Sequence, residues 1–114
     1  TGSSGELDFQ NNSIPSVSLP NSSNVINKLR FNINNIVNFD VTPLTGANNG
    51  IQIRLNNNDM TTLSMDNLIS DLVSKGWTNG QLFLSGQSTG QLPTSTAADF
   101  VTLDTVLNWN ITYL

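Results

Sequence analysis

One short motif occurs three times in the first 63 residues, and it limits the folds open to this chain more than any other feature. Each copy has two apolar residues separated by one position and an Asn three positions after the second. Further apolar residues follow two and five positions after that Asn. The copies span residues 7–17, 29–39 and 53–63. A unit that repeats around one fixed polar residue predicts stacked coils, which usually offer surfaces for binding.

The repeat continues in a weaker form beyond the third copy. Leu82-x-Leu84 begins 29 residues after Ile53, and Ile111-x-Tyr113 begins 29 residues after Leu82. Each of these segments alternates apolar and polar residues, as a strand with one buried face requires. The sequence therefore predicts about five short strands in one parallel sheet.

The connections between the strands differ along the chain. Residues 20–24 and 43–50 are rich in Pro, Asn, Ser and Gly, which favour turns, so we expect loop returns in the N-terminal half. Residues 66–76 instead have apolar residues at helical spacing. Asp66 is the candidate N-cap of this helix, and Lys75-Gly76 the candidate stop.

A second helix is predicted over residues 96–107. Thr96 and Asp99 approximate a capping box, and the apolar residues at helical spacing on the inward face are Phe100, Leu103 and Leu107. A Trp follows each predicted helix, at positions 77 and 109. We interpret both indoles as core residues that pack under the helices.

The length of 114 residues suits a single domain. We expect it to span residues 6–114, with short repeats over about 6–52 and longer, helix-containing repeats over about 53–114. Residues 1–5 read either as a remnant of cloning or as the end of a preceding coil.

The series Leu-x-Phe-x-x-Asn-x-Ile resembles the leucine-rich repeat consensus Leu-x-Leu-x-x-Asn-x-Leu. The resemblance covers residues 7–63 well and residues 82–89 in part, where Gln87 stands at the Asn position and Thr89 replaces an apolar residue. It implies an irregular α/β solenoid with its parallel strands on a concave face. It also implies that four amide side chains lie inside the turns and bond to the backbone of adjacent coils: Asn12, Asn34, Asn58 and Gln87.

Physical chemistry supports the same role for these amides. A coil that turns sharply after a strand leaves backbone groups facing the interior, and an amide side chain can both donate to them and accept from them. Loss of such an amide should therefore destabilise the fold.

The last 35 or so residues show a looser, second resemblance. The run Gln81-Leu82-Phe83-Leu84, the pair Pro93-Thr94, a helix and then Trp109 resemble the closing segment of leucine-rich repeat domains in secreted surface proteins of Bacteroidota and in proteins of their phages. This resemblance implies display outside the cell, on a virion or on a bacterial surface.

Composition argues against several classes of function. The chain has four Lys and Arg residues against eight Asp and Glu, which disfavours binding to nucleic acid or to anionic lipid. No apolar run approaches the length of a membrane span. His and Cys are both absent, which removes the imidazole base, the thiolate nucleophile and the ordinary zinc ligands. We expect no enzyme activity and no cofactor.

The remaining acidic residues have simpler interpretations than catalysis or metal binding. The pairs Asp66 with Asp71 and Asp99 with Asp104 could in principle serve glycoside hydrolysis, but each pair lies five apart on a predicted helix, so the side chains diverge. Helix capping and solvation are the favoured roles. Asp40 and residues 57–59 offer oxygen ligands without the spacing of known calcium loops, so no metal site is predicted.

The outward face of the sheet is the candidate binding surface. Residues between and beside the buried positions point outward and stack in rows, one residue from each strand. Arg30 and Arg54 then lie side by side, which is unfavourable unless an anion or acidic partner contacts them, and Asp8 can pair with Arg30. Arg54 beside Phe83 could grip a sugar ring or a carboxylate, although Asp8 and solvent could equally satisfy the arginines. The predicted ligand-binding residues are Asp8, Arg30, Asn32, Arg54, Asn56 and Phe83.

These patterns favour a recognition module that binds a protein or a cell-surface glycan in adhesion or host-receptor binding. The alternative is a structural module, used for assembly or capping, whose open sheet edges pair with other chains of a larger particle.

Overall fold

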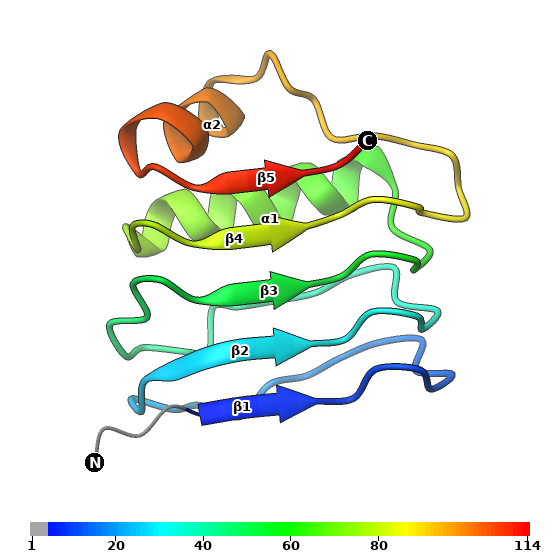
Figure 1. The fold of residues 1–114 in the computed structure, drawn as a ribbon, viewed down its shortest axis with the longest axis horizontal. Helices are drawn as coiled ribbons and strands as arrows, with labels where there is room; N and C mark the ends of the chain where they lie inside the picture. The colour runs from blue at the N-terminus through cyan, green and yellow to red at the C-terminus, as the bar shows by residue number, and fades with distance from the viewer. Residues whose placement is uncertain (1–4) are drawn as a thin grey trace.

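The computed structural model describes residues 5–114 and shows an α/β fold with a five-stranded parallel sheet (Figure 1). The expected remnant or coil end at residues 1–4 lies outside the described residues, whereas Gly5 begins the first strand. Strand order follows the sequence, β1-β2-β3-β4-β5, as predicted. The strands are β1 Gly5–Asp8, β2 Ile26–Arg30, β3 Gln52–Arg54, β4 Gln81–Phe83 and β5 Asn110–Thr112.

The repeated motif sets the register of the sheet. Leu29 pairs with Leu7 on one side and with Ile53 on the other, and the series continues through Leu82 to Ile111. From Leu29 to Leu82 these residues are buried and form the centre of the apolar core. Since side chains alternate along a strand, this register turns every intervening residue to the outer face.

The first half of the chain returns through loops, as expected. These loops contact one another at two isolated parallel bridges, Val17 with Phe39 and Ser22 with Leu44. Gly46 has to be a glycine here, because an added Cβ would lie 2.6 Å from the backbone oxygens of Ser23 and Asn24. The loops therefore form a second backbone layer behind the strands (Figure 1).

Helix α1 spans Thr62–Lys75 and begins four residues before the predicted start. Its N-cap is Thr61 rather than Asp66, because Thr61 and Ser64 bond reciprocally to each other's backbone N–H. The early start changes the third motif copy, in which Leu63 lies on the outer side of the helix and is 70% exposed. Gly76 ends the helix in the left-handed conformation, with a φ of 70°.

Helix α2 spans Ala98–Val101 and continues as a π-helical turn, η1, over Thr102–Val106. The predicted capping box of Thr96 and Asp99 is wrong, because the N-cap is Ala97 and no side chain caps it. Phe100 and Leu103 face the core, as predicted. Neither helix in residues 5–114 has the length and apolar character needed to cross a membrane.

Both Trp residues are buried, and each binds a backbone carbonyl of another unit. Trp77 Nε1 donates to the carbonyl of Gly46 at 3.1 Å, and Trp109 Nε1 donates to the carbonyl of Trp77 at 2.7 Å. The interpretation of the indoles as core residues is therefore confirmed, and each indole also links the backbone of successive units.

Candidate binding face

Four of the six residues predicted to bind a ligand form one row across the outer face of the sheet. The Cα register places Asp8 next to Arg30, Arg30 next to Arg54, and Arg54 next to Phe83. The row crosses four strands, so a partner lying across the sheet would meet all four side chains. Adjacent arginines repel each other unless an acid lies close to them.

Arg30 makes its ion pair with Glu6 and not with Asp8. Its Nε lies 2.9 Å from Glu6 Oε1, although the two groups are not aligned as a hydrogen bond. Asp8 instead accepts hydrogen bonds from the backbone and side chain of Gln10. The expected ion pair of Asp8 with Arg30 is therefore not formed. The Asp8 carboxylate bonds to Gln10, two residues further along the same chain.

Arg54 is held in place by two neighbours. Its Cζ lies 5.0 Å from the centroid of the Phe83 ring, and its Nε donates to Gln52 Oε1 at 2.9 Å. Gln52 in turn donates to Gln81 Oε1 at 2.9 Å. The guanidinium carbon thus lies over the ring of Phe83, and among the described residues the terminal nitrogens have no hydrogen-bond partner.

The position of Arg54 over Phe83 bears on whether the pair can bind a sugar ring or a carboxylate. The Arg54 guanidinium covers one face of the Phe83 ring, so that face cannot also stack on a sugar ring. A planar carboxylate can still accept two parallel hydrogen bonds from the terminal nitrogens of Arg54. An acidic group fits this arrangement better than an apolar sugar face.

The two predicted asparagines lie two residues beyond Arg30 and Arg54 along the chain, and they differ in exposure. Asn32 is only 7% exposed and donates to Gln10 Oε1 at 3.3 Å, so it is less accessible to a ligand than the sequence suggested. Its buried Oδ1 has no hydrogen-bond partner among the described residues. Asn56 is half-buried at the equivalent position in the next unit. Only Asn56 of this pair remains open to a partner.

The amide side chains assigned to the turns make bonds between successive units. Asn34 Nδ2 donates to the carbonyls of Phe9 and Phe31, and its Oδ1 accepts from the backbone N–H groups of Asn12 and Ile14. Asn58 makes the equivalent contacts with Phe31, Leu55 and Ile36. Gln87 does so with Leu55, Leu84 and Met60, its longer side chain replacing Asn.

Asn12 departs from this pattern. It is exposed, and its Nδ2 donates only to Phe9 and Gln10 within its own unit. The burial expected from the motif fails because β1 is an edge strand and no described unit stacks beyond it.

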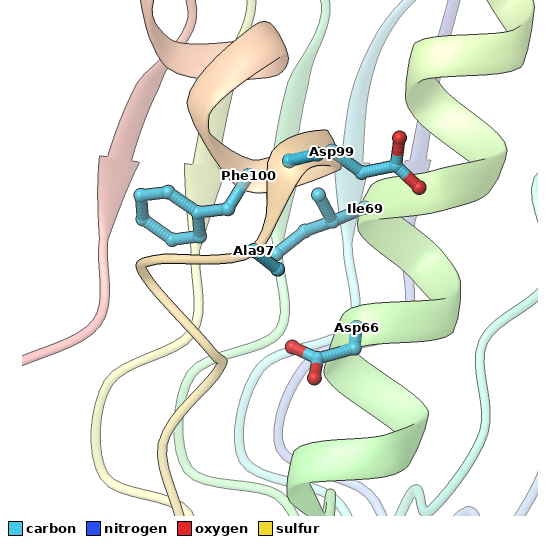
Figure 2. Close-up of a pocket in the computed structure, with 6 residues that line it drawn as sticks. Asp66, Ile69, Ala97, Asp99 and Phe100 are labelled. Atoms are coloured by element: carbon cyan, nitrogen blue, oxygen red, sulfur yellow. The ribbon is translucent and has the colours of Figure 1, made fainter.

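A small cavity of about 190 Å³ lies between α1 and α2, lined by Asp66, Ile69, Ala97, Ala98, Asp99 and Phe100 (Figure 2). The carboxylates of Asp66 and Asp99 extend to opposite sides in this view. Asp66 accepts hydrogen bonds from the backbone N–H of Thr94 at 2.8 Å and from its hydroxyl at 2.6 Å. Asp66 thus fastens the segment before α2 to α1, a role that the sequence alone did not indicate.

Two other acids have altered proton affinity. Burial raises the pKa of Asp71, and the negative charge of Asp40 adds to the increase while Lys75 opposes it. Hydrogen bonds from Thr42 hold the pKa of Asp40 below its usual value. These residues lie away from the outer face of the sheet, so they bear on stability rather than on ligand binding.

The outward rows expected from the sequence include Glu6, Gln52 and Gln81, but these residues were not predicted to bind a ligand or to contact the arginines. The strand register confirms that all three lie in the row beside Arg30 and Arg54. Their choice of partner depends on rotamers, for which the repeat carries no signal. Within residues 5–114 no three acidic, His or Cys residues gather as they would around a metal ion.

Comparison with models of protein families, with curated proteins and with solved structures finds no match to this chain.

Proposed function

We propose that this chain is a non-enzymatic recognition module that binds a protein or a cell-surface glycan through the outer face of its sheet. The observation that carries the proposal is the guanidinium of Arg54, which lies over the ring of Phe83, is bonded to Gln52 and is adjacent to Arg30. Two cations in one row, with Glu6 beside only one of them, favour an acidic group in the partner.

The proposed architecture is an irregular solenoid of the leucine-rich repeat type. Support comes from the strand order and from the pairing of successive loops. It also comes from the buried amide side chains of Asn34, Asn58 and Gln87, here called the amide ladder, which each bond to the backbone of the preceding unit. The proposed setting is adhesion or host-receptor binding outside the cell, on a phage virion or a bacterial surface. That setting rests on the resemblance of residues 79–114 to proteins of Bacteroidota and their phages.

The test is adhesion of the labelled chain to whole cells of a panel of Bacteroidota strains. The double variant Arg54→Ala/Phe83→Ala should lose adhesion while its circular dichroism spectrum stays unchanged. Lys75→Ala is the matched control, because Lys75 also lies over an aromatic ring, that of Trp77 at 5.8 Å, but away from the candidate row. Adhesion that survives in the double variant would refute the site.

A structural or assembly role is the second candidate, and the edges of the described sheet favour it. Among residues 5–114, β1 and β5 each pair with one strand, and sheet edges invite pairing with other chains. Sedimentation of the purified chain separates the candidates. A monomer at high concentration supports recognition, and obligate trimers or larger assemblies support the structural role.

A further inference from the structure

One turn of the second unit holds a strained backbone position. In four successive units, the residue two places after the second apolar residue of the motif has a positive φ, between 59° and 73°. Asn and Gly tolerate this left-handed conformation, and they occupy three of the four places. Ile33 occupies the fourth with a φ of 60°, where a β-branched residue is a genuine outlier. The four residues are Asn11, Ile33, Asn57 and Gly86.

Neighbouring units hold Ile33 in this conformation. Its backbone N–H donates to the carbonyl of Asn56 at 3.0 Å, and the carbonyl of Asn32 accepts from the N–H of Asn11 at 3.0 Å. Described units lie on both sides of Ile33, so its conformation does not depend on where the sheet ends. The stacked turns therefore impose the left-handed conformation on this position, which Asn or Gly would adopt with less strain.

The core does not account for an isoleucine at this position. The Ile33 side chain is 46% exposed, whereas Phe31 before it and Ile36 after it are 3% and 0% exposed. The position thus combines backbone strain with apolar surface in water, and Asn would avoid both. Strained residues that the fold itself does not require cluster at binding sites and active sites.

Ile33 adjoins the candidate binding face. Asn56, whose carbonyl accepts from Ile33, is one of the predicted ligand-binding residues and lies two residues after Arg54. Two residues of extended chain span about 7 Å. A partner whose acidic group bonds to Arg54 therefore comes within reach of the aliphatic side chain of Ile33.

An arginine close to an exposed isoleucine discriminates between the two classes of partner. Acidic glycans carry their carboxylates on hydroxylated rings, and an aliphatic side chain that covers hydroxyl groups removes water without replacing its hydrogen bonds. The Phe83 ring, which could stack on a sugar, is covered on one face by Arg54. A protein surface, by contrast, presents acidic and apolar side chains next to each other.

We propose that the partner is a protein, and that Ile33 packs on an apolar side chain of this protein while Arg54 bonds to an acidic one. This assignment rests on the proposed function, because it concerns the same outer face. Ile33 strengthens binding and weakens the fold, so its replacement separates the two effects.

Replacement of Ile33 by Asn tests both effects. Ile33→Asn should raise the melting temperature by about 4 °C, because Asn tolerates the left-handed conformation. The same variant should weaken adhesion to whole Bacteroidota cells about tenfold, measured as the concentration of labelled chain at half-saturation. Ile33→Leu keeps an aliphatic side chain and should adhere within about twofold of the wild type.

Val25→Asn is the matched control. Val25 is also β-branched and is 45% exposed, but it lies before β2 rather than after it and is not among the described residues with a positive φ. Its replacement should not raise the melting temperature and should leave adhesion unchanged. An Ile33→Asn variant that is no more stable than the wild type, or that adheres equally well, would overturn the role of Ile33.

Treatment of the cells tests the class of partner. Adhesion that disappears after proteinase K and persists after mild periodate oxidation of glycans would support a protein partner. Adhesion that survives proteinase K, or that is lost after periodate, would overturn it.

The double variant Arg54→Ala/Phe83→Ala, measured in the same assays, separates this assignment from the proposed function. If the double variant loses adhesion, the outer face remains the binding site, and a negative result above refutes only the protein partner or the role of Ile33. If the double variant adheres like the wild type, or the wild type adheres to no strain, the proposed function fails and the assignment of a protein partner fails with it.

Discussion

The side-chain amide of Asn58 donates a 3.0 Å hydrogen bond to the carbonyl of Phe31, a residue of the preceding unit. The same nitrogen donates to Leu55 in its own unit, and Asn58 Oδ1 accepts from the backbone N–H of Ile36 at 3.0 Å. One buried side chain thus satisfies backbone groups of two units, and Asn34 repeats the arrangement one unit earlier.

Replacement of Asn58 by Ala should lower the free energy of unfolding by about 3 kcal/mol, because each buried backbone group left unpaired costs about 1–3 kcal/mol. Urea denaturation followed by circular dichroism measures the loss. Asn12→Ala is the control, since Asn12 is exposed and bonds only within its own unit, and it should cost less than about 1 kcal/mol. Equal losses in the two variants would contradict the role assigned to the ladder.

The sheet could be predicted from the sequence because one residue pattern specifies both its alternation and its register. Leu7, Leu29 and Ile53 occupy the same place in each motif copy, and they pair in that order in the structure. The start of α1 could not be placed in the same way. The motif continues to Leu63, while Thr61 and Ser64 form the reciprocal cap that begins the helix earlier, so a local signal overrode the repeat.

For the candidate site, the sequence predicted which outward residues are neighbours across the sheet but not which side chains bond to one another. The register places Arg30 between Asp8 and Arg54, but side-chain reach decides that Arg30 pairs with Glu6. Likewise the motif turns Asn32 outward, but it is buried in the structure and donates to Gln10, a contact that the motif does not specify. Such choices depend on rotamers and on neighbours that the repeat does not fix.

Replacement of Trp77 by Phe should destabilise the fold more than its small change in volume suggests. The variant keeps an aromatic ring but removes the N–H that binds the carbonyl of Gly46. An unpaired buried carbonyl costs about 1–3 kcal/mol, and thermal denaturation would measure the loss. Tyr113→Phe is a control that also removes one polar group, from a half-buried residue whose hydroxyl has no hydrogen-bond partner among residues 5–114. A loss as small as in that control would contradict the role of the indole N–H.

Gly80 lies against the ring of Trp109, where an added Cβ would come within 2.5 Å of three ring carbons. Gly80→Ala should therefore cost about 1–3 kcal/mol, because a packed core cannot admit the methyl group without shifting the ring. A double-mutant cycle with Trp109→Leu tests the cause. In the Trp109→Leu variant, Gly80→Ala should lower the free energy of unfolding clearly less than it does in the wild type. Equal losses with and without Trp109 would exclude the clash as the cause.

Replacement of Asp71 by Asn should stabilise the protein at neutral pH. Burial, and then the charge of Asp40, raise the pKa of Asp71 in the folded state. When the pKa of a carboxyl is higher in the folded than in the unfolded protein, its protonated form stabilises the fold. This stabilisation is fully present below the pKa of the unfolded chain, about 3.9, and is lost as the pH rises through the pKa of the folded protein. The ionised carboxylate therefore disfavours folding at neutral pH, and the neutral amide removes this effect.

Urea denaturation at a series of pH values checks this expectation. Because Asp71 is partly exposed, the gain at neutral pH should stay below about 1 kcal/mol, and it should disappear near about pH 3, where the wild-type carboxyl is protonated in both states. Asp104→Asn makes the same change of charge at an exposed position of η1 and provides the control. If Asp71→Asn were destabilising at neutral pH, or if its effect did not depend on pH, Asp71 would be stabilising the fold through a contact of its charged form.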